Sequence, residues 1–124
     1  MLIDEREMIM NEAVMNLVER IKQDYINWTQ RCADVRGGEL TDTNKEMIAR
    51  FVEEVEFEYG RKYIKVLQNK SAWGFIVAVD NDKKFKYGDI LMAAGYNAPA
   101  RNKARGNVFE LDGLRVQWTG ANYL

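Results

Sequence analysis

Apolar residues recur at alternating steps of four and three along the first third of the chain. They stand at positions Val14, Val18, Ile21, Tyr25, Trp28, Cys32 and Val35. This spacing predicts an α-helix from about residue 4 to about residue 35, which Gly37 and Gly38 would end. A stripe of this kind either packs on the chain's own sheet or second helix, or lets the helix form a homo-oligomer. For self-association the candidate contacts are Val14, Val18, Ile21, Tyr25 and Trp28.

A second helix is predicted over residues 44–59. The preceding Thr43 and the later Glu46 have the spacing of a capping box, in which each side chain bonds the other residue's backbone N–H. The apolar face would consist of Met47, Ile48, Phe51 and Val55. Gly60 would end this helix. Four acids late in the segment are interpreted as a solvated face: Glu53, Glu54, Glu56 and Glu58.

The rest of the chain alternates apolar and polar residues between turn signals. The predicted strands cover 61–68, 72–79, 84–94 with a kink at Gly88, 107–110 and 114–118. Helices followed by a run of strands indicate the α+β class, here two N-terminal helices and a small antiparallel sheet of about four to five strands. We expect a helical region over 1–60 and a β region over 61–124 to pack as one unit.

The charges divide unevenly along the chain. The net charge is −1, but residues 1–59 hold 14 acids and 7 bases, whereas residues 60–124 hold 5 acids and 11 bases. This division indicates that the two halves face different neighbours. The second half would meet an acidic partner, or the first half would pack on the second, in the same chain or in another copy.

Composition excludes several classes of protein. Apolar residues make up 47% of the chain, which is enough for a core, and the longest apolar runs are too short to span a membrane. The first residues lack the pattern of a secretory signal. The single cysteine, Cys32, excludes an internal disulfide and is expected to be buried and inert on the first helix. Histidine is absent, which removes the usual general base and the commonest metal ligand.

The most unusual segment is the predicted loop over residues 95–107. It carries Arg101, Lys103 and Arg105, spaced two apart with no acid among them, and Tyr96 near its start. Cations beside aromatic platforms are the general recipe for binding single-stranded nucleic acid, with Trp73 or Trp118 as further stacking partners. The alternatives are a solvated loop and a protein interface.

Several short motifs in the second half resemble a known pattern. These are Gly-Asp-Ile-Leu-Met-Ala-Ala at 88–94, Ala-Pro-Ala-Arg at 98–101, Arg-Gly-Asn at 105–107 and Trp-Thr-Gly-Ala-Asn-Tyr-Leu at 118–124. Over residues 62–124 the chain resembles small uncharacterised proteins of marine bacteriophages, especially those infecting cyanobacteria. The resemblance implies a phage origin, in the cytoplasm of a bacterial host or in the virion. It implies no activity and no functional residues.

Two functions remain open from these observations. The first is a non-catalytic interaction or structural module, in which the helices self-assemble and the loop contacts a partner. The second is a small nucleic-acid-binding protein that uses the basic half. An enzyme is the weakest hypothesis, because no catalytic or metal motif is present and no cofactor is expected. The residues that would serve one are Glu56, Glu58, Asp89 and Lys86.

Overall fold

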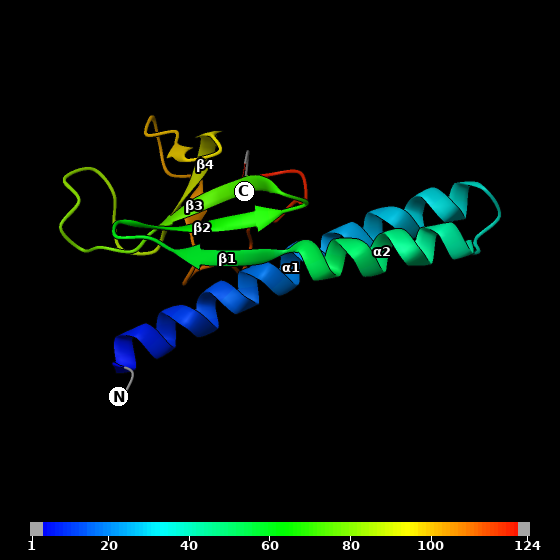
Figure 1. Cartoon of the computed structure of the whole chain (residues 1–124), viewed down its shortest axis with the longest axis horizontal. Coiled ribbons are helices and arrows are strands. Elements are labelled where there is room, and N and C mark those ends of the chain that lie inside the picture. The colour runs from blue at the N-terminus through cyan, green and yellow to red at the C-terminus, as the bar shows by residue number, and fades with distance from the viewer. Residues whose placement is uncertain (1–3, 122–124) are drawn as a thin grey trace.

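Two helices precede an antiparallel sheet in the computed structural model, which describes residues 4–121 (Figure 1). The elements are α1 (Glu5–Val35), α2 (Asp42–Glu54), β1 (Glu56–Tyr59), β2 (Tyr63–Gln68), β3 (Ser71–Val77), β4 (Asp89–Gly95), β5 (Ala98–Pro99) and β6 (Gly106–Asn107). The α+β class is therefore confirmed, with six strands where four to five were predicted. The last residues of the 118–124 motif lie outside the described residues.

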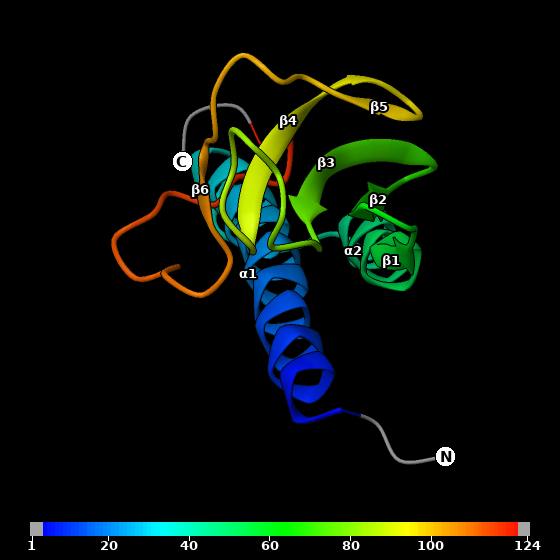
Figure 2. The same ribbon diagram turned by 90° about the vertical axis from the view of Figure 1, so that its left-hand side faces the viewer.

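The long first helix has nearly the predicted bounds. The Asp4 carboxylate accepts a hydrogen bond from the backbone N–H of Arg6 at 2.8 Å and so caps the first turn. At the other end Gly37 takes a φ of +123°, a conformation that favours glycine. The helix crosses one face of the sheet and then projects beyond it beside α2 as a helical hairpin (Figures 1 and 2).

The second helix begins and ends earlier than predicted. Its N-cap is Thr41, whose side chain accepts from the backbone N–H of Asn44 at 3.1 Å, while the Asn44 side chain accepts from Thr41 at 3.2 Å. This reciprocal cap replaces the one predicted at Thr43 and Glu46. The helix ends at Glu54, where the chain turns directly into a strand.

Two strands that were not predicted, β1 and β5, are present, and β1 takes residues assigned to the second helix. Residues 56–59 alternate between glutamate and an aromatic residue. This period of two is typical of a strand, although the same residues were predicted as the end of the second helix. They pair antiparallel with β2, and Phe57 lies opposite Val66. Backbone pairing and the burial of Phe57 against the core therefore outweigh helix propensity here.

The sheet has the strand order β1-β2-β3-β4-β5, and β6 also pairs with β4. A tight turn at Asn69 and Lys70, both with positive φ, joins β2 to β3. The predicted third strand begins only at Asp89, because residues up to Gly88 form a loop that ends in a φ of +90°. The prediction over 107–110 shortens to Gly106–Asn107, and that over 114–118 is wrong, since no strand forms there.

The main core lies between the sheet and the helices. The predicted stripe contributes four of its buried side chains, namely Val14, Val18, Ile21 and Tyr25. These four side chains pack within their own chain, and self-association through the stripe stays a prediction. Trp28 retains 39% exposure. Cys32 is exposed, contrary to prediction, because the buried positions in this part of the helix are Thr29 and Ala33.

A smaller apolar cluster lies on the opposite, outer face of the sheet. It contains Phe75, Val77, Phe85 and Leu91, with Tyr63 packed against it. Phe85 belongs to the loop between β3 and β4, which therefore folds back over this face. This loop brings several charged residues of the basic half together.

Candidate functional site

Asp82 organises the loop between β3 and β4. Its side chain is 1% exposed, and one carboxylate oxygen accepts hydrogen bonds from the backbone N–H groups of Lys84 at 2.8 Å and Phe85 at 3.0 Å. The carboxylate thus satisfies two loop amides that no strand partner reaches. A buried carboxylate also needs opposite charge, and two neighbouring segments supply it.

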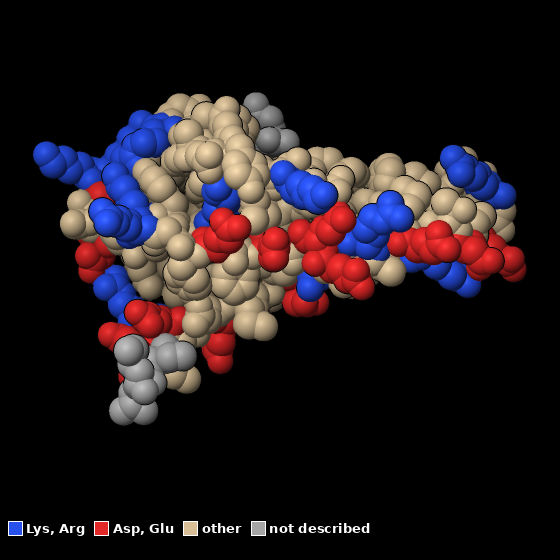
Figure 3. All heavy atoms as spheres, in the orientation of Figure 1, with Lys and Arg blue, Asp and Glu red and all other residues tan. Residues whose placement is uncertain are grey.

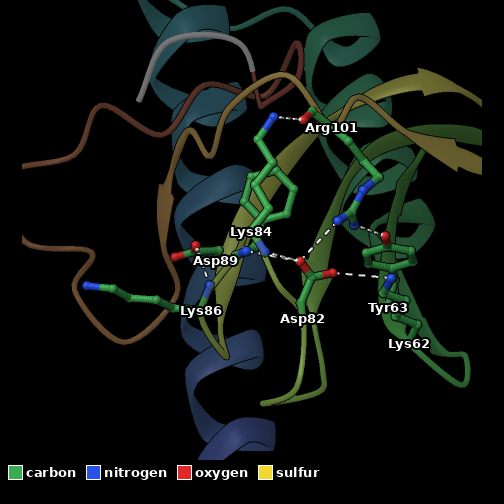
Figure 4. A network of polar contacts seen from close by, with 8 residues as sticks. Lys62, Tyr63, Asp82, Lys84, Lys86, Asp89 and Arg101 are labelled. Atoms are coloured by element: carbon green, nitrogen blue, oxygen red, sulfur yellow. Dashed lines mark hydrogen bonds and ion pairs between the residues drawn. The ribbon is translucent and has the colours of Figure 1, made fainter.

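Two cations converge on Asp82 (Figure 4). Arg101 approaches it at 3.0 Å and Lys62 at 3.2 Å. The hydrogen bond from Arg101, followed by those from the loop amides, holds the pKa of Asp82 well below its usual range. Arg101 also donates to the Tyr63 hydroxyl and lies over the Phe85 ring at 4.8 Å. Arg101 is therefore fixed in one orientation, with its pKa raised mainly by its bond to Asp82.

The network ties together three segments that are distant in sequence. Besides these ion pairs, the Lys84 ammonium donates to the backbone carbonyl of Arg101 at 2.6 Å. The side chains of Lys62 and Arg101 nevertheless stay 49% and 39% exposed. The same cations that neutralise Asp82 therefore still present charge to solvent.

Two hollows adjoin at this end of the sheet and share Arg61 and Lys62. The larger, of about 510 Å³, is also lined by Lys83, Asp82 and Arg101. The smaller, of about 250 Å³, is lined by Glu58, Tyr59, Gly60, Tyr63, Lys65, Phe75 and Asn97 as well. We call the two together the cationic groove. Figure 3 shows basic side chains gathered at this end, opposite the helical hairpin, and acidic side chains in a band along the helices.

The groove contains five cations against two carboxylates. The cations are Arg61, Lys62, Lys65, Lys83 and Arg101, and the carboxylates are Glu58 and Asp82. These charges give the groove a net charge of +3, with Asp82 and its two partners included. A hollow of this charge attracts anions and raises their local concentration.

An exposed aromatic ring stands beside the groove. Tyr96, in the turn between β4 and β5, is 52% exposed. The Lys65 ammonium lies 4.1 Å from the centre of its ring and donates to the Asn97 side chain at 2.6 Å. The ring is thus in contact with a cation and still half exposed to solvent.

The residues predicted from the basic loop fall in different places. Arg101 belongs to the groove and Tyr96 stands beside it. Lys103 and Arg105 do not line either hollow. Lys103 is exposed, whereas Arg105 is half-buried and its backbone N–H bonds the Ile90 carbonyl beside β4.

The tryptophans predicted as stacking partners do not accompany Tyr96. Trp73 is buried in the core, and its indole N–H donates to the Gln117 carbonyl at 2.7 Å. Trp118 packs edge-on against Tyr25 of α1, at 5.1 Å between ring centres. Both belong to the helix-covered side of the sheet, where the core holds them.

Sequence reasoning missed four of the groove's cations: Arg61, Lys62, Lys65 and Lys83. A signal for three of them was present in the predicted strand over 61–68, which opens with two cations and places a third on its polar face. Their meeting with Arg101 depends on the sheet's strand order, which the sequence did not predict.

The carboxylates considered for an enzyme lie apart. Asp89, at the start of β4, accepts from the backbone N–H of Lys86 at 2.8 Å and from the Asn107 side chain at 3.1 Å. Glu56 and Glu58 lie on β1, from which β2 and β3 separate Asp89. Among residues 4–121 no group of three or more acidic or cysteine side chains is placed to hold a metal ion. In the same range no helix is long and apolar enough to cross a membrane.

Comparisons with protein-family models, with curated proteins and with solved structures found no match. The function is therefore argued from the groove itself.

Proposed function

We propose that this protein is a non-catalytic binding module that holds single-stranded nucleic acid in the cationic groove. The observation that carries the proposal is the convergence of five cations, from β2 and the turn before it, the β3–β4 loop and the segment after β5, on two adjoining hollows. Lysine and arginine that line a groove and contact a phosphate backbone supply most of the affinity of such proteins.

The aromatic ring beside the groove favours a single strand over a duplex. Bases are free to stack on a protein ring only when they are unpaired, and each stacked base contributes about 1–3 kcal/mol. Tyr96 is exposed and is held beside Lys65, so a base on the ring and a phosphate near the ammonium would be bound together. Aromatic and cation thus form one combined contact.

The wider hypothesis of an interaction module remains part of this proposal. The apolar stripe of α1 is not proposed as its contact surface. Burial of the stripe within the chain supports this narrower form, because those side chains already have partners in the core. The phage origin, with a location in the host cytoplasm or the virion, stays a proposal supported by the motifs of residues 62–124 alone.

The test measures binding of a labelled oligothymidylate of about 15 nucleotides, a length within the site sizes of known single-strand binders, by fluorescence anisotropy over a range of salt concentrations. The groove variant replaces Arg61, Lys65 and Lys83 with glutamine and leaves the Asp82 network intact. Each phosphate contact contributes about 0.7 to the log–log salt slope, so the variant should lower the slope by about two units. Tyr96→Ala should weaken binding with little change in slope.

A matched control changes the same charge elsewhere. Arg31, Arg36 and Lys45 are exposed on or near the helical hairpin, so their replacement with glutamine removes three charges far from the groove. The control should keep the wild-type slope. Absence of salt-dependent binding by the wild-type protein, or equal loss in both triple variants, would refute the proposed function.

A further inference from the structure

The strand β1 forms an open edge of the sheet (Figure 2). Within residues 4–121 it pairs only with β2, whereas β4 at the other side is covered by β5 and β6. An unpaired strand edge presents backbone N–H and C=O groups that a further strand can bind. Its charged side chains are the glutamates Glu56 and Glu58, of which Glu58 also lines the cationic groove.

The backbone groups that face outward can be assigned from the turn that follows. The Gly60 N–H donates to the Tyr63 carbonyl at 2.8 Å, which makes these two residues a hydrogen-bonded pair. Hydrogen-bonded and non-bonded pairs alternate along an antiparallel ladder. Glu58 therefore bonds β2, and the N–H and C=O groups of Phe57 and Tyr59 point to the open edge.

The side chains of β1 divide between the two faces of the sheet. Glu58 lies opposite Lys65 on the outer face, and Glu56 shares that face because the side-chain period is two. Both glutamates are exposed. Phe57 packs toward the main core on the other face, and the Tyr59 hydroxyl donates to the Asn11 side chain of α1.

A hollow of about 250 Å³ lies beside this edge, between α1 and β1. Its apolar lining consists of Met15, Val18, Val55 and Phe57, and its charged lining of Glu19, Lys22 and Glu56. Met15 is exposed by 59% and adds apolar surface beside the edge. An added strand would therefore find apolar surface on the helix side and carboxylates on the outer side.

We propose that the β1 edge binds an extended peptide segment of a partner protein, in which basic and apolar residues alternate. The strand β2, which already pairs with the other side of β1, has this alternation of basic and apolar residues where it faces β1. In β2, Lys65 stands across from Glu58, while the apolar Ile64 and Val66 stand across from Tyr59 and Phe57. A strand on the open side meets the same two faces and is selected by the same pattern.

A second copy of this chain is a poor occupant of the edge. Antiparallel pairing of β1 with β1 would set glutamates of one copy against glutamates of the other, and like charges directly opposite are destabilising. The charge at the edge thus discourages self-pairing and attracts a basic strand. Negative charge in the helical half of the chain adds to this attraction.

The test uses an acetylated, fluorescent peptide that alternates lysine and isoleucine, titrated with the full chain. We expect it to bind, and an alternating glutamate–isoleucine peptide not to bind. The double variant Glu56→Lys, Glu58→Lys should weaken binding of the basic peptide about tenfold, because it removes two exposed ion pairs and puts like charges in their place. The control Glu39→Lys, Glu46→Lys carries the same net charge and should bind as the wild type does.

Two further readouts use the wild-type protein and do not depend on a variant folding. The basic peptide with N-methyl groups at the residues that face the edge should lose binding, because it cannot donate to the strand. On binding the unmodified peptide, amide hydrogen exchange should slow at Phe57 and Tyr59 more than at Glu56 and Glu58. The proposal would be overturned if the methylated peptide bound as tightly as the unmodified one, or if the glutamate–isoleucine peptide bound as tightly as the lysine–isoleucine peptide. Concentration-dependent self-association that competes with the peptide would also overturn it.

Discussion

Truncation of Ile21 tests whether the apolar stripe of α1, from Val14 to Tyr25, stabilises the single chain or an assembly. Ile21 is fully buried in the core between α1 and the sheet. Ile21→Ala removes three carbon atoms and leaves a cavity that the sheet backbone cannot close. Such substitutions cost about 2–5 kcal/mol, and we expect about 3 kcal/mol here. For a chain of this size that loss lowers Tm by about 10 °C.

The assay is urea unfolding of wild type and variant at two protein concentrations, with the native mass checked by light scattering. If the stripe packs within the chain, the midpoint falls in Ile21→Ala, is the same at both concentrations, and the native mass is unchanged. Met8→Ala is the matched control on the same helix, since Met8 is 53% exposed and its loss should cost under about 0.5 kcal/mol. A concentration-dependent midpoint that Ile21→Ala abolishes, with a smaller native particle, would refute the reasoning.

Two further predictions concern the loop between β3 and β4. The pKa of Asp82 is lowered in the folded chain, so its stabilising effect is complete above the unfolded value of about 3.9 and is lost as pH falls through the lower folded pKa. Unfolding measured between pH 7 and pH 2 should show this loss, and Asp82→Asn should flatten the dependence below about pH 4. A Cβ at Gly88 would lie 2.6 Å from the Phe109 ring, whereas one at Gly38, with a similar φ of +92°, meets nothing within 4 Å. Each change to alanine should cost about 1–2 kcal/mol through positive φ, with Gly88→Ala the more costly in thermal unfolding because of the added contact; equal costs would show that the ring moves aside.

The elements with one unambiguous period were predictable from sequence. The stripe from Val14 to Tyr25 fits only a helix, and the pair of glycines after Val35 ends it, so this helix was predicted nearly to the residue. Residues 51–59 fit two periods at once. Their apolar positions suit a helix up to Val55, and the Glu–aromatic alternation from Glu56 suits a strand. Only pairing with β2 decides between them, and that pairing is a tertiary contact.

The candidate site was predictable only in its local part. Arg101 and Tyr96 stood out because the loop over residues 95–107 is basic and has an aromatic residue, Tyr96, near its start. Asp82 falls between the predicted strands over 72–79 and 84–94, but nothing in its neighbourhood indicates that Arg101, 19 positions later, reaches its carboxylate. Strand order creates that meeting, by placing the β3–β4 loop beside both the turn before β2 and the segment after β5.

Two ion pairs that join the two halves do not cancel their uneven charge. Arg6 pairs with Asp80 and Arg20 with Asp112, so that in both cases the acidic half gives a cation and the basic half gives an acid. Glu58 lies where the two proposed surfaces meet, since it lines the cationic groove and belongs to the open edge. Reversal of Glu56 and Glu58 to lysine should thus tighten nucleic-acid binding while it weakens the basic peptide. Loss of both activities together would instead indicate that the variant disturbs the fold and not the charge.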